Sequence, residues 1–276
     1  MVCARIMSLS GLCTCLLAPL LALYAPCSNS QQKANAPWEG VAFSADAKQI
    51  AQAAAAIRVD EDAEITVLTD ERRVTYDAAG RGIFYSHWVY RVESKEALSW
   101  AATAQSTWSP WRQKKPVIRA RVISPDGSAA ELDPSVLTDV ATHDQRPEIY
   151  EDERTLSGPL PAVGVGSIVE MERTFEDTAP LFEAGDLHRF RMPQEVPVLH
   201  ASFEVNAPAS LPLRYKLRGN PAFTVTRSEE NGRVILRFEQ PSRSEYEAPE
   251  KDLPSDFDSA PAVDYSTSPS WDTSST

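Results

Sequence analysis

The sequence has no cysteine over most of its length. All four cysteines fall among the first 27 of its 276 residues, and none occurs from Ser28 onward; they are Cys3, Cys13, Cys15 and Cys27. Because a disulfide, a thiolate metal site and a cysteine nucleophile all need a thiol, the body of the protein can form none of them. The sequence therefore predicts no catalytic cysteine, and we expect no metal and no cofactor.

Positive charge is scarce as well. The chain has 27 lysines and arginines against 39 aspartates and glutamates, which gives a net charge of −12. An acidic chain is repelled by phosphate backbones and by anionic lipid. We expect no nucleic-acid partner, and membrane contact only through a leader or a lipid anchor.

Several enzyme motifs are missing. The sequence has no glycine-rich phosphate loop, no Gly-x-Ser-x-Gly motif and no His-x-x-x-His pair. His188 lies near Glu183 and Asp186, so a weak metal or acid–base site is an alternative, but scattered histidines are the better interpretation. The histidines are His87, His143, His188 and His200.

An enzyme that works with two carboxylates, such as a glycosidase, is a further alternative. Acidic residues gather at Glu148, Glu151, Asp152, Glu153, Glu183 and Asp186. In a chain this acidic, such clusters are mostly solvated surface, and the sequence does not show the separation between any two of them.

The N-terminus has the pattern of a secretory signal. Arg5 is the one charged residue among the first thirty, residues 12–24 are almost wholly apolar, and small residues follow at 25–30. We assign residues 1–27 to a signal peptide and expect export to the periplasm or the extracellular space. Lipid attachment at Cys27 is the lesser alternative, because Pro26 occupies the place of the small residue that such sites require.

Residues 28–63 read as a linker followed by one short peripheral helix. Ser44 is the predicted N-cap and Asp46 falls in the first turn. Alanine and isoleucine then recur at helical spacing as far as Arg58. The apolar stripe is narrow and rich in alanine, so the helix buries little area.

Residues 64–242 have the pattern of an antiparallel β-sandwich. About ten short segments alternate apolar and polar side chains, as strands with one buried face do. The clearest is residues 117–123, where Ile118, Ala120 and Val122 share one face; the turn 125–127 and a returning strand at 128–132 follow. Residues 135–158 are polar and predict a surface crossing. Past Pro241 the composition predicts a tail, residues 243–276, that buries no core.

Four residues of the central hairpin region are candidates for ligand binding. Trp108 and Trp111 flank a Ser-Pro pair and could stack on sugar rings or a peptide, although capping the sandwich core is the more usual role of such residues. Arg119 and Arg121 share a strand face and could clamp a carboxylate. A cross-strand ion-pair ladder with Glu170 and Glu172, which have matching spacing, is the favoured alternative.

Two phrases resemble the DUF3857 family, a domain of unknown function. They are Arg-Ala-Arg-Val-Ile-Ser-Pro-Asp-Gly at 119–127 and Leu-Pro-Ala-Val-Gly-Val-Gly-Ser-Ile-Val-Glu at 160–170. The resemblance covers roughly residues 64–271 and implies a β-sandwich accessory module outside the cytoplasm, normally followed by a papain-like transglutaminase-like domain with a Cys-His-Asp set. Residues 267–271 resemble the junction into that domain. A shortened member, a fragment of a longer protein and a stand-alone module all remain open.

We therefore predict a non-catalytic exported accessory or interaction module, not an enzyme unless the chain is part of a longer transglutaminase-like protein. Its expected partner is a transglutaminase-like domain or protein. The alternative is a module that binds carbohydrate or cell-wall peptide of the cell envelope through Trp108, Trp111, Arg119 and Arg121.

Overall fold

The computed structural model describes residues 36–58, 60–142, 152–182, 185–193, 196–219, 222–243 and 261–268. The predicted leader, residues 1–27, lies outside them, as do His143, Glu148, Glu151, Glu183 and the end of the predicted junction. Within the described chain, neither α-helix has the length and apolar character needed to cross a lipid bilayer.

Strands dominate the described chain, and the helices are short. The elements are α1 (Ala47–Ala55), β1 (Ile65–Tyr76), β2 (Gly82–Val92), α2 (Leu98–Ala101), β3 (Thr103–Trp108), β4 (Val117–Ile123), β5 (Ala129–Glu131), a 3₁₀ turn (Pro134–Val136), β6 (Thr138–Ala141), β7 (Arg154–Pro159), β8 (Ile168–Glu176), β9 (Leu187–Arg191), β10 (Ala201–Pro208), β11 (Arg214–Arg218), β12 (Thr224–Glu230), β13 (Arg233–Gln240) and β14 (Ala262–Ser266).

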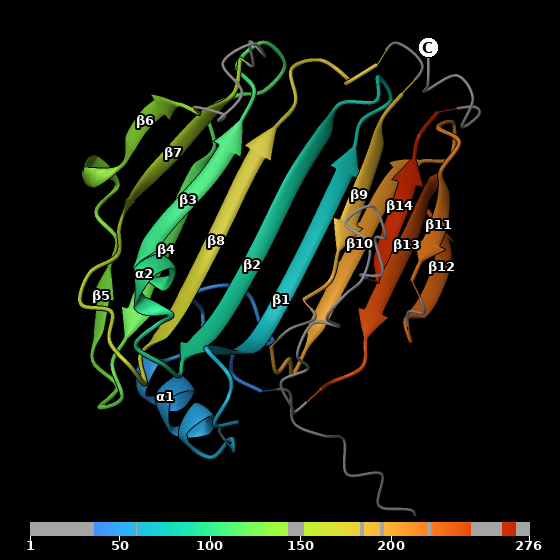
Figure 1. The fold of residues 1–276 in the computed structure, drawn as a ribbon. Helices are drawn as coiled ribbons and strands as arrows, with labels where there is room; N and C mark the ends of the chain where they lie inside the picture. The colour runs from blue at the N-terminus through green and yellow to red at the C-terminus, as the bar shows by residue number, and fades with distance from the viewer. Residues whose placement is uncertain are drawn as a thin grey trace, which may run out of the picture. The chain divides into compact units, whose positions relative to one another are not determined.

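Eight of these strands form one large sheet in the order β12-β13-β10-β1-β2-β8-β4-β5 (Figure 1). Neighbouring strands are antiparallel, except that β1 and β10 pair in parallel, with Asp70 opposite Ala201. Since more than a hundred residues separate β1 from β10 in the chain, no short turn constrains their direction. The mainly antiparallel β fold predicted from the sequence is confirmed.

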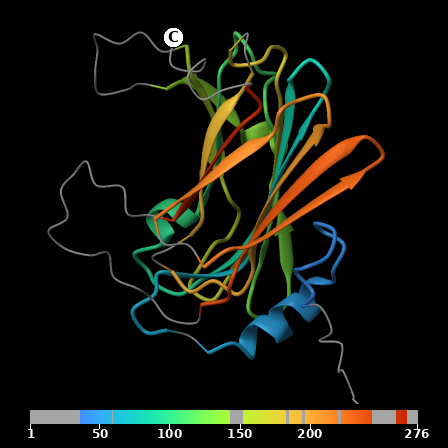
Figure 2. The ribbon, with the colours of Figure 1, turned by 90° about the vertical axis from the view of Figure 1, so that its right-hand side faces the viewer.

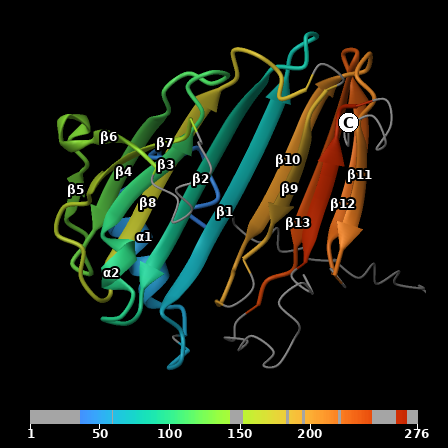
Figure 3. The same ribbon diagram turned by 45° about the horizontal axis from the view of Figure 1, so that its top comes forward.

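Two smaller sheets pack against one face of the large sheet, which we call the inner face (Figures 2 and 3). They have the orders β6-β7-β3 and β11-β14-β9. One apolar core lies between the layers and joins Val122 and Val169 of the large sheet to Ala104 of β3 and Val263 of β14. Fully burying side chains of this kind stabilises the fold by roughly 1.5–3 kcal/mol each.

The outer face of the large sheet carries α1 and a second, smaller core. Ile50 and Ala54 of the helix pack with Leu68, Val89 and other buried residues of the sheet. The helix begins two residues later than predicted. Asp46, and not Ser44, is the N-cap, because the Asp46 carboxylate accepts the amides of Lys48 and Gln49 at 3.0 and 3.2 Å.

The turn predictions hold in detail. Gly127 has φ +83°, and the Asp126 carboxylate accepts the Ser128 amide at 2.9 Å, as the Pro-Asp-Gly sequence predicts. Between β12 and β13, Asn231 and Gly232 both have positive φ, 51° and 73°. This is the two-residue hairpin turn that an Asn-Gly pair favours.

Two segments differ from the prediction. Residues 135–158, expected to cross the surface without strands, contribute β6 and β7. The segment past Pro241 was expected to bury no core, yet Ala262–Ser266 is a fully buried strand at the centre of its sheet, between β9 and β11. Ala-Val-Asp-Tyr-Ser is too short a pattern to stand out in a Ser- and Asp-rich stretch, and its burial depends on neighbours far away in the sequence.

Candidate functional site

The arginine pair predicted as a clamp lies on the outer face, next to β8. Arg119 is directly opposite Glu172, and Arg121 is opposite Glu170. The Arg121 Nε lies 2.6 Å from the Glu170 carboxylate, and both side chains are buried, whereas Arg119 is exposed and reaches Glu172 only at 3.8 Å. The cross-strand ladder favoured from the sequence is therefore present, with one strong pair and one weak pair.

Glu170 is the centre of a larger buried network. Its carboxylate also contacts His87 Nε2 at 3.0 Å and accepts the backbone amide of Phe43 at 2.7 Å. Burial opposes ionisation of Glu170, but the hydrogen bonds from His87 and Phe43 and the Arg121 charge outweigh it and lower its pKa. The network therefore fixes the segment before α1 to the sheet.

Both arginines also hold that segment. Arg121 donates to the Ala45 carbonyl at 2.9 Å. The guanidinium carbons of Arg119 and Arg121 lie 4.3 and 5.5 Å from the centre of the Phe43 ring, within the range of a cation–π contact. The pair thus contacts the chain's own N-terminal segment.

The predicted tryptophans lie in the other layer. Trp108 is the last residue of β3 and is half-buried, and Trp111 follows in the next turn with 59% of its surface exposed. β3 belongs to the small sheet on the inner face, while Arg119 and Arg121 point to the outer face. The structure therefore does not bring the predicted tryptophans and arginines together in one site.

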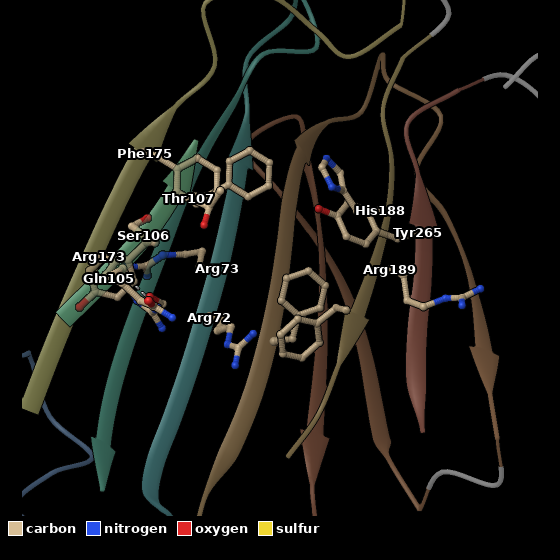
Figure 4. A pocket seen from close by; sticks show the side chains of 15 residues that line it. Arg72, Arg73, Gln105, Ser106, Thr107, Arg173, Phe175, His188, Arg189 and Tyr265 are labelled. Carbon is tan, nitrogen blue, oxygen red and sulfur yellow. Dashed lines mark hydrogen bonds between the residues drawn. The ribbon is translucent and has the colours of Figure 1, made fainter. Parts of the chain in front are cut away.

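A cavity lies between the two small sheets, and we call it the inner cleft (Figure 4). Its volume is about 360 Å³. Gln105, Ser106 and Thr107 of β3 form one wall, and residues 188–190 of β9 form the other. Its floor is the inner face of β1, β2, β8 and β10. The size falls within the roughly 300–1,000 Å³ usual for ligand pockets.

Two arginines lie on the floor of the inner cleft. Arg72 of β1, Ser86 of β2 and Arg173 of β8 are direct neighbours across adjacent strands. Since adjacent strands are about 4.8 Å apart, the two arginine backbones are separated by about 10 Å, with the small serine between them. The floor is therefore a shallow trough with a guanidinium group on each side.

The trough has more positive than negative charge. Arg72 forms a two-pronged pair with Asp70, both contacts being 2.8 Å, and also lies over the Phe190 ring at 4.8 Å. Arg173 donates to the Gln105 carbonyl at 3.2 Å, and no carboxylate pairs with it among the described residues. Burial and the nearby Arg72 charge lower the pKa of Arg173. Two guanidinium groups thus share one carboxylate.

Aromatic rings surround the charged floor. Phe84 stacks on Phe175 with ring centres 4.6 Å apart, in the row of the sheet next to the arginines. Phe190 stacks on Phe203 at 4.3 Å on the β9 side. The inner cleft can therefore bury an apolar side chain beside a charged group.

His188 is held in the wall by a buried network. Its Nε2 lies 2.7 Å from the Asp186 carboxylate, which also accepts the Tyr76 hydroxyl at 2.9 Å. The His188 ring stacks on Tyr265 at 5.5 Å. Burial opposes ionisation of Asp186, but the His188 and Tyr76 hydrogen bonds lower its pKa, while burial raises the pKa of Tyr265 far above its usual value.

The histidines that the structure describes do not cluster. His87, His188 and His200 each meet a separate carboxylate, those of Glu170, Asp186 and Glu71. Within the described ranges, no three residues among His, Cys, Asp and Glu are placed to share a metal ion. Of the alternative site named from the sequence, the structure brings His188 and Asp186 together, while Glu183 lies outside the described residues.

Sequence reasoning missed the inner cleft, but two signals mark it. In β8, Val169, Met171 and Phe175 face the core, and Arg173 interrupts this apolar series on the same face. In β2, Ser86 interrupts the series of Phe84, Trp88 and Tyr90 in the same way. A polar residue at a core position of a strand is costly without partners, so both interruptions indicate a cavity or a site.

Comparison with solved structures supports the fold. One similar structure is the crystal structure of a proposed protease from Parabacteroides distasonis ATCC 8503, with a TM-score of 0.65 and 15% identity over 75% of this chain and 41% of that one. A second, an M1 zinc metallopeptidase from Deinococcus radiodurans, has a TM-score of only 0.36 at 14% identity, over 74% of this chain and 42% of that one. The chain thus spans about two fifths of each.

At 15% identity the first likeness concerns the fold alone, and the second, with a TM-score of 0.36, carries no argument. The comparison with curated proteins finds no match. The model of the family described as a domain of unknown function with solved structure, DUF3857, matches residues 78–242. That range contains β2 through β13, with the central hairpin and most of the large sheet. The chain belongs to the DUF3857 family.

Proposed function

We propose that this chain is a non-catalytic recognition module that acts outside the cytoplasm and uses the inner cleft to hold a ligand or partner. One observation carries the proposal: the lining of the inner cleft combines two guanidinium groups with stacked aromatic rings. Such groups bind and orient anionic and apolar groups. Export is supported by the sequence pattern of residues 1–27.

The contacts of His188, the histidine in this lining, favour a structural role. His188 uses its Nε2 on Asp186 and packs between Tyr265 and Phe84, with ring centres 5.5 and 5.3 Å away. A histidine that stacks on one ring, meets a second ring edge-on and is bonded at one nitrogen supports the wall of the cleft. The family resemblance adds the expected partner, a transglutaminase-like domain or protein, which the module would position or regulate.

Activity assays on the exported, purified chain test the non-catalytic role. Peptidase, transamidase and glycosidase substrates are expected to give no turnover above a heat-denatured control. Reproducible turnover that His188→Gln abolishes, with the melting temperature unchanged, would refute the proposal. Fractionation of the producing cells tests localisation, and recovery of the chain in the cytoplasm with residues 1–27 intact would contradict export.

Binding of carbohydrate or cell-wall peptide through the tryptophans is a second candidate, favoured by the exposed indole of Trp111. Stacking of a sugar ring on this indole would quench its fluorescence. Titration with cell-wall glycan fragments measures this, and Trp111→Ala is expected to remove the quenching. If the variant and the parent chain respond alike, this candidate is wrong.

A further inference from the structure

We propose that the inner cleft binds an extended peptide segment that bears a carboxylate, laid between β3 and β9 as an added strand. The inference rests on the proposed recognition function and names its ligand class. Three properties of the inner cleft support it: the chemistry of its two walls, the charge of its floor, and the aromatic rings beside that charge.

The two walls are strand edges. β3 stands at the end of the order β6-β7-β3, and β9 at the end of the order β11-β14-β9. Among the strands that the structure describes, β3 and β9 each have one neighbouring strand, and both line the same cleft. Such a strand edge presents amide and carbonyl groups that an extended peptide can satisfy, a recurrent mode of peptide recognition. On the β3 edge the Gln105 carbonyl already accepts from Arg173, so the other edge groups of the strand are the ones a peptide would meet.

The floor selects for negative charge. The chain as a whole is acidic, with a net charge of −12, yet no aspartate or glutamate is among the fifteen residues that line the cleft. Of the four arginines among them, Arg189 is paired with Asp264 and Arg73 lies over the Tyr85 ring, so Arg72 and Arg173 supply the charge of the floor. On the floor, Arg173 has no carboxylate partner among the described residues, while Arg72 is paired with Asp70. A carboxylate above Ser86 would lie between the two guanidinium groups and would balance the unpaired charge.

The aromatic rings add a place for a neighbouring side chain. Side chains of an added strand alternate in direction, so every second one would point to the floor. The row of Phe84 and Phe175 follows the row of Ser86 and Arg173 along the strands. Two floor-facing side chains of one strand could therefore meet the arginines and the aromatic rings together, which favours a peptide over an isolated small anion.

Retention of defined peptide pools on the immobilised, exported chain tests the inference. Two pools of end-blocked hexapeptides have a fixed glutamate or a fixed glutamine at the third position and random uncharged residues elsewhere. We expect the glutamate pool to be retained about tenfold or more above the glutamine pool, because a charge-assisted hydrogen bond contributes about that factor. Equal retention of the two pools overturns the inference.

Four variants assign the effect to the trough. Arg173→Gln should abolish the preference for glutamate, and Arg173→Lys should keep part of it. Ser86→Phe should block the retention of both pools, since its ring fills the space between the arginines. Arg227→Gln is the matched control, because Arg227 is exposed on β12 and pairs with Glu229. The inference fails if Arg173→Gln keeps the full preference, or if Arg227→Gln loses as much.

Hydrogen exchange tests the added strand itself. Bound peptide from the glutamate pool should slow exchange of backbone amides in β3 and β9. No slowing in either strand overturns the proposed pose. If Arg173→Gln lowers the melting temperature, its loss of binding is not informative. Ser86→Phe, which keeps both arginines, then tests the site, and retention of the glutamate pool by this variant overturns the inference.

The outcomes separate this inference from the proposed function. If neither pool binds and the chain shows no turnover, the ligand class is wrong and the non-catalytic role stands. If the glutamate pool binds and is cleaved, the ligand class stands and the non-catalytic role is wrong. Retention of cell-wall glycans in place of peptides also overturns the inference, and it favours the site at Trp111.

Discussion

Replacing Glu170 by glutamine should destabilise the protein strongly. Glu170 is almost fully buried, and its carboxylate meets Arg121, His87 and the Phe43 amide at 2.6–3.0 Å. Removing one partner of a buried ion pair leaves the other charge uncompensated, at a cost of about 3–5 kcal/mol. We expect a loss of that size in the free energy of unfolding, measured by urea titration with tryptophan fluorescence.

Glu172→Gln is the matched control, two residues further along the same strand face. Its partner Arg119 is exposed and lies 3.8 Å away, so the loss should be about 0–1 kcal/mol. A loss below about 1 kcal/mol for Glu170→Gln, or equal losses for the two variants, would refute the assignment of a buried network.

The pH dependence of Glu170→Gln gives a second check. Because the folded protein lowers the pKa of Glu170 below the usual 4.5, the ionised carboxylate stabilises the fold above that value, and this contribution is lost as the pH falls through the folded pKa. The difference in stability between parent and variant should therefore be full near neutral pH and shrink in acid. A difference that does not change with pH would contradict the role of the charge.

Three further predictions follow from single positions. Gly127→Ala should lower the free energy of unfolding, measured in urea, by about 1–3 kcal/mol, because φ is +83° and the new Cβ would lie 2.6 Å from the Lys48 side chain. Gly232→Ala is the control and should lower it less, because nothing lies within 4 Å of the new Cβ. His200 has a raised pKa, mainly through the Glu71 carboxylate that lies 3.4 Å from its Nε2, so its contribution to stability is present below about pH 6.5 and lost as the pH rises through the folded value. His200→Gln should therefore lower the melting temperature at about pH 5.5 and have little effect at about pH 9; equal shifts at both would contradict this. Trp111→Ala should leave the melting temperature nearly unchanged because the indole is 59% exposed, and a fall of more than about 4 °C would contradict a surface position.

The sequence predicts the fold well where local pattern decides it. The face shared by Ile118, Ala120 and Val122 is buried as its period-2 pattern requires. The Asn231 and Gly232 turn has the backbone that its residue types favour. Even the register of Arg119 and Arg121 against β8 follows from spacing alone, because opposite charges at the same period meet across a pair of strands.

The sequence predicts the fold less well where the burial of a strand depends on neighbouring strands that are distant in the chain. β14 is buried because β9 and β11 flank it, and those neighbours come about 70 and 45 residues earlier in the chain. Its own five residues include Asp264 and Ser266, which argue for a loop by composition. Asp264 is tolerated because Arg189 and Arg218 lie against it on the two neighbouring strands.

The inner cleft could not be predicted from the sequence either, because the residues that form it are far apart in the chain. Arg72 and Arg173 are about a hundred residues apart, and only the pairing of β1 with β2 and of β2 with β8 sets them in one row. Arg72 alone reads as an exposed charge on a strand. What the sequence does show is that Arg173 lies on an otherwise apolar face of its strand. A charged side chain at such a core position costs stability unless other groups compensate it, and local contacts alone do not do so. We therefore interpret such a residue as a sign of a functional site.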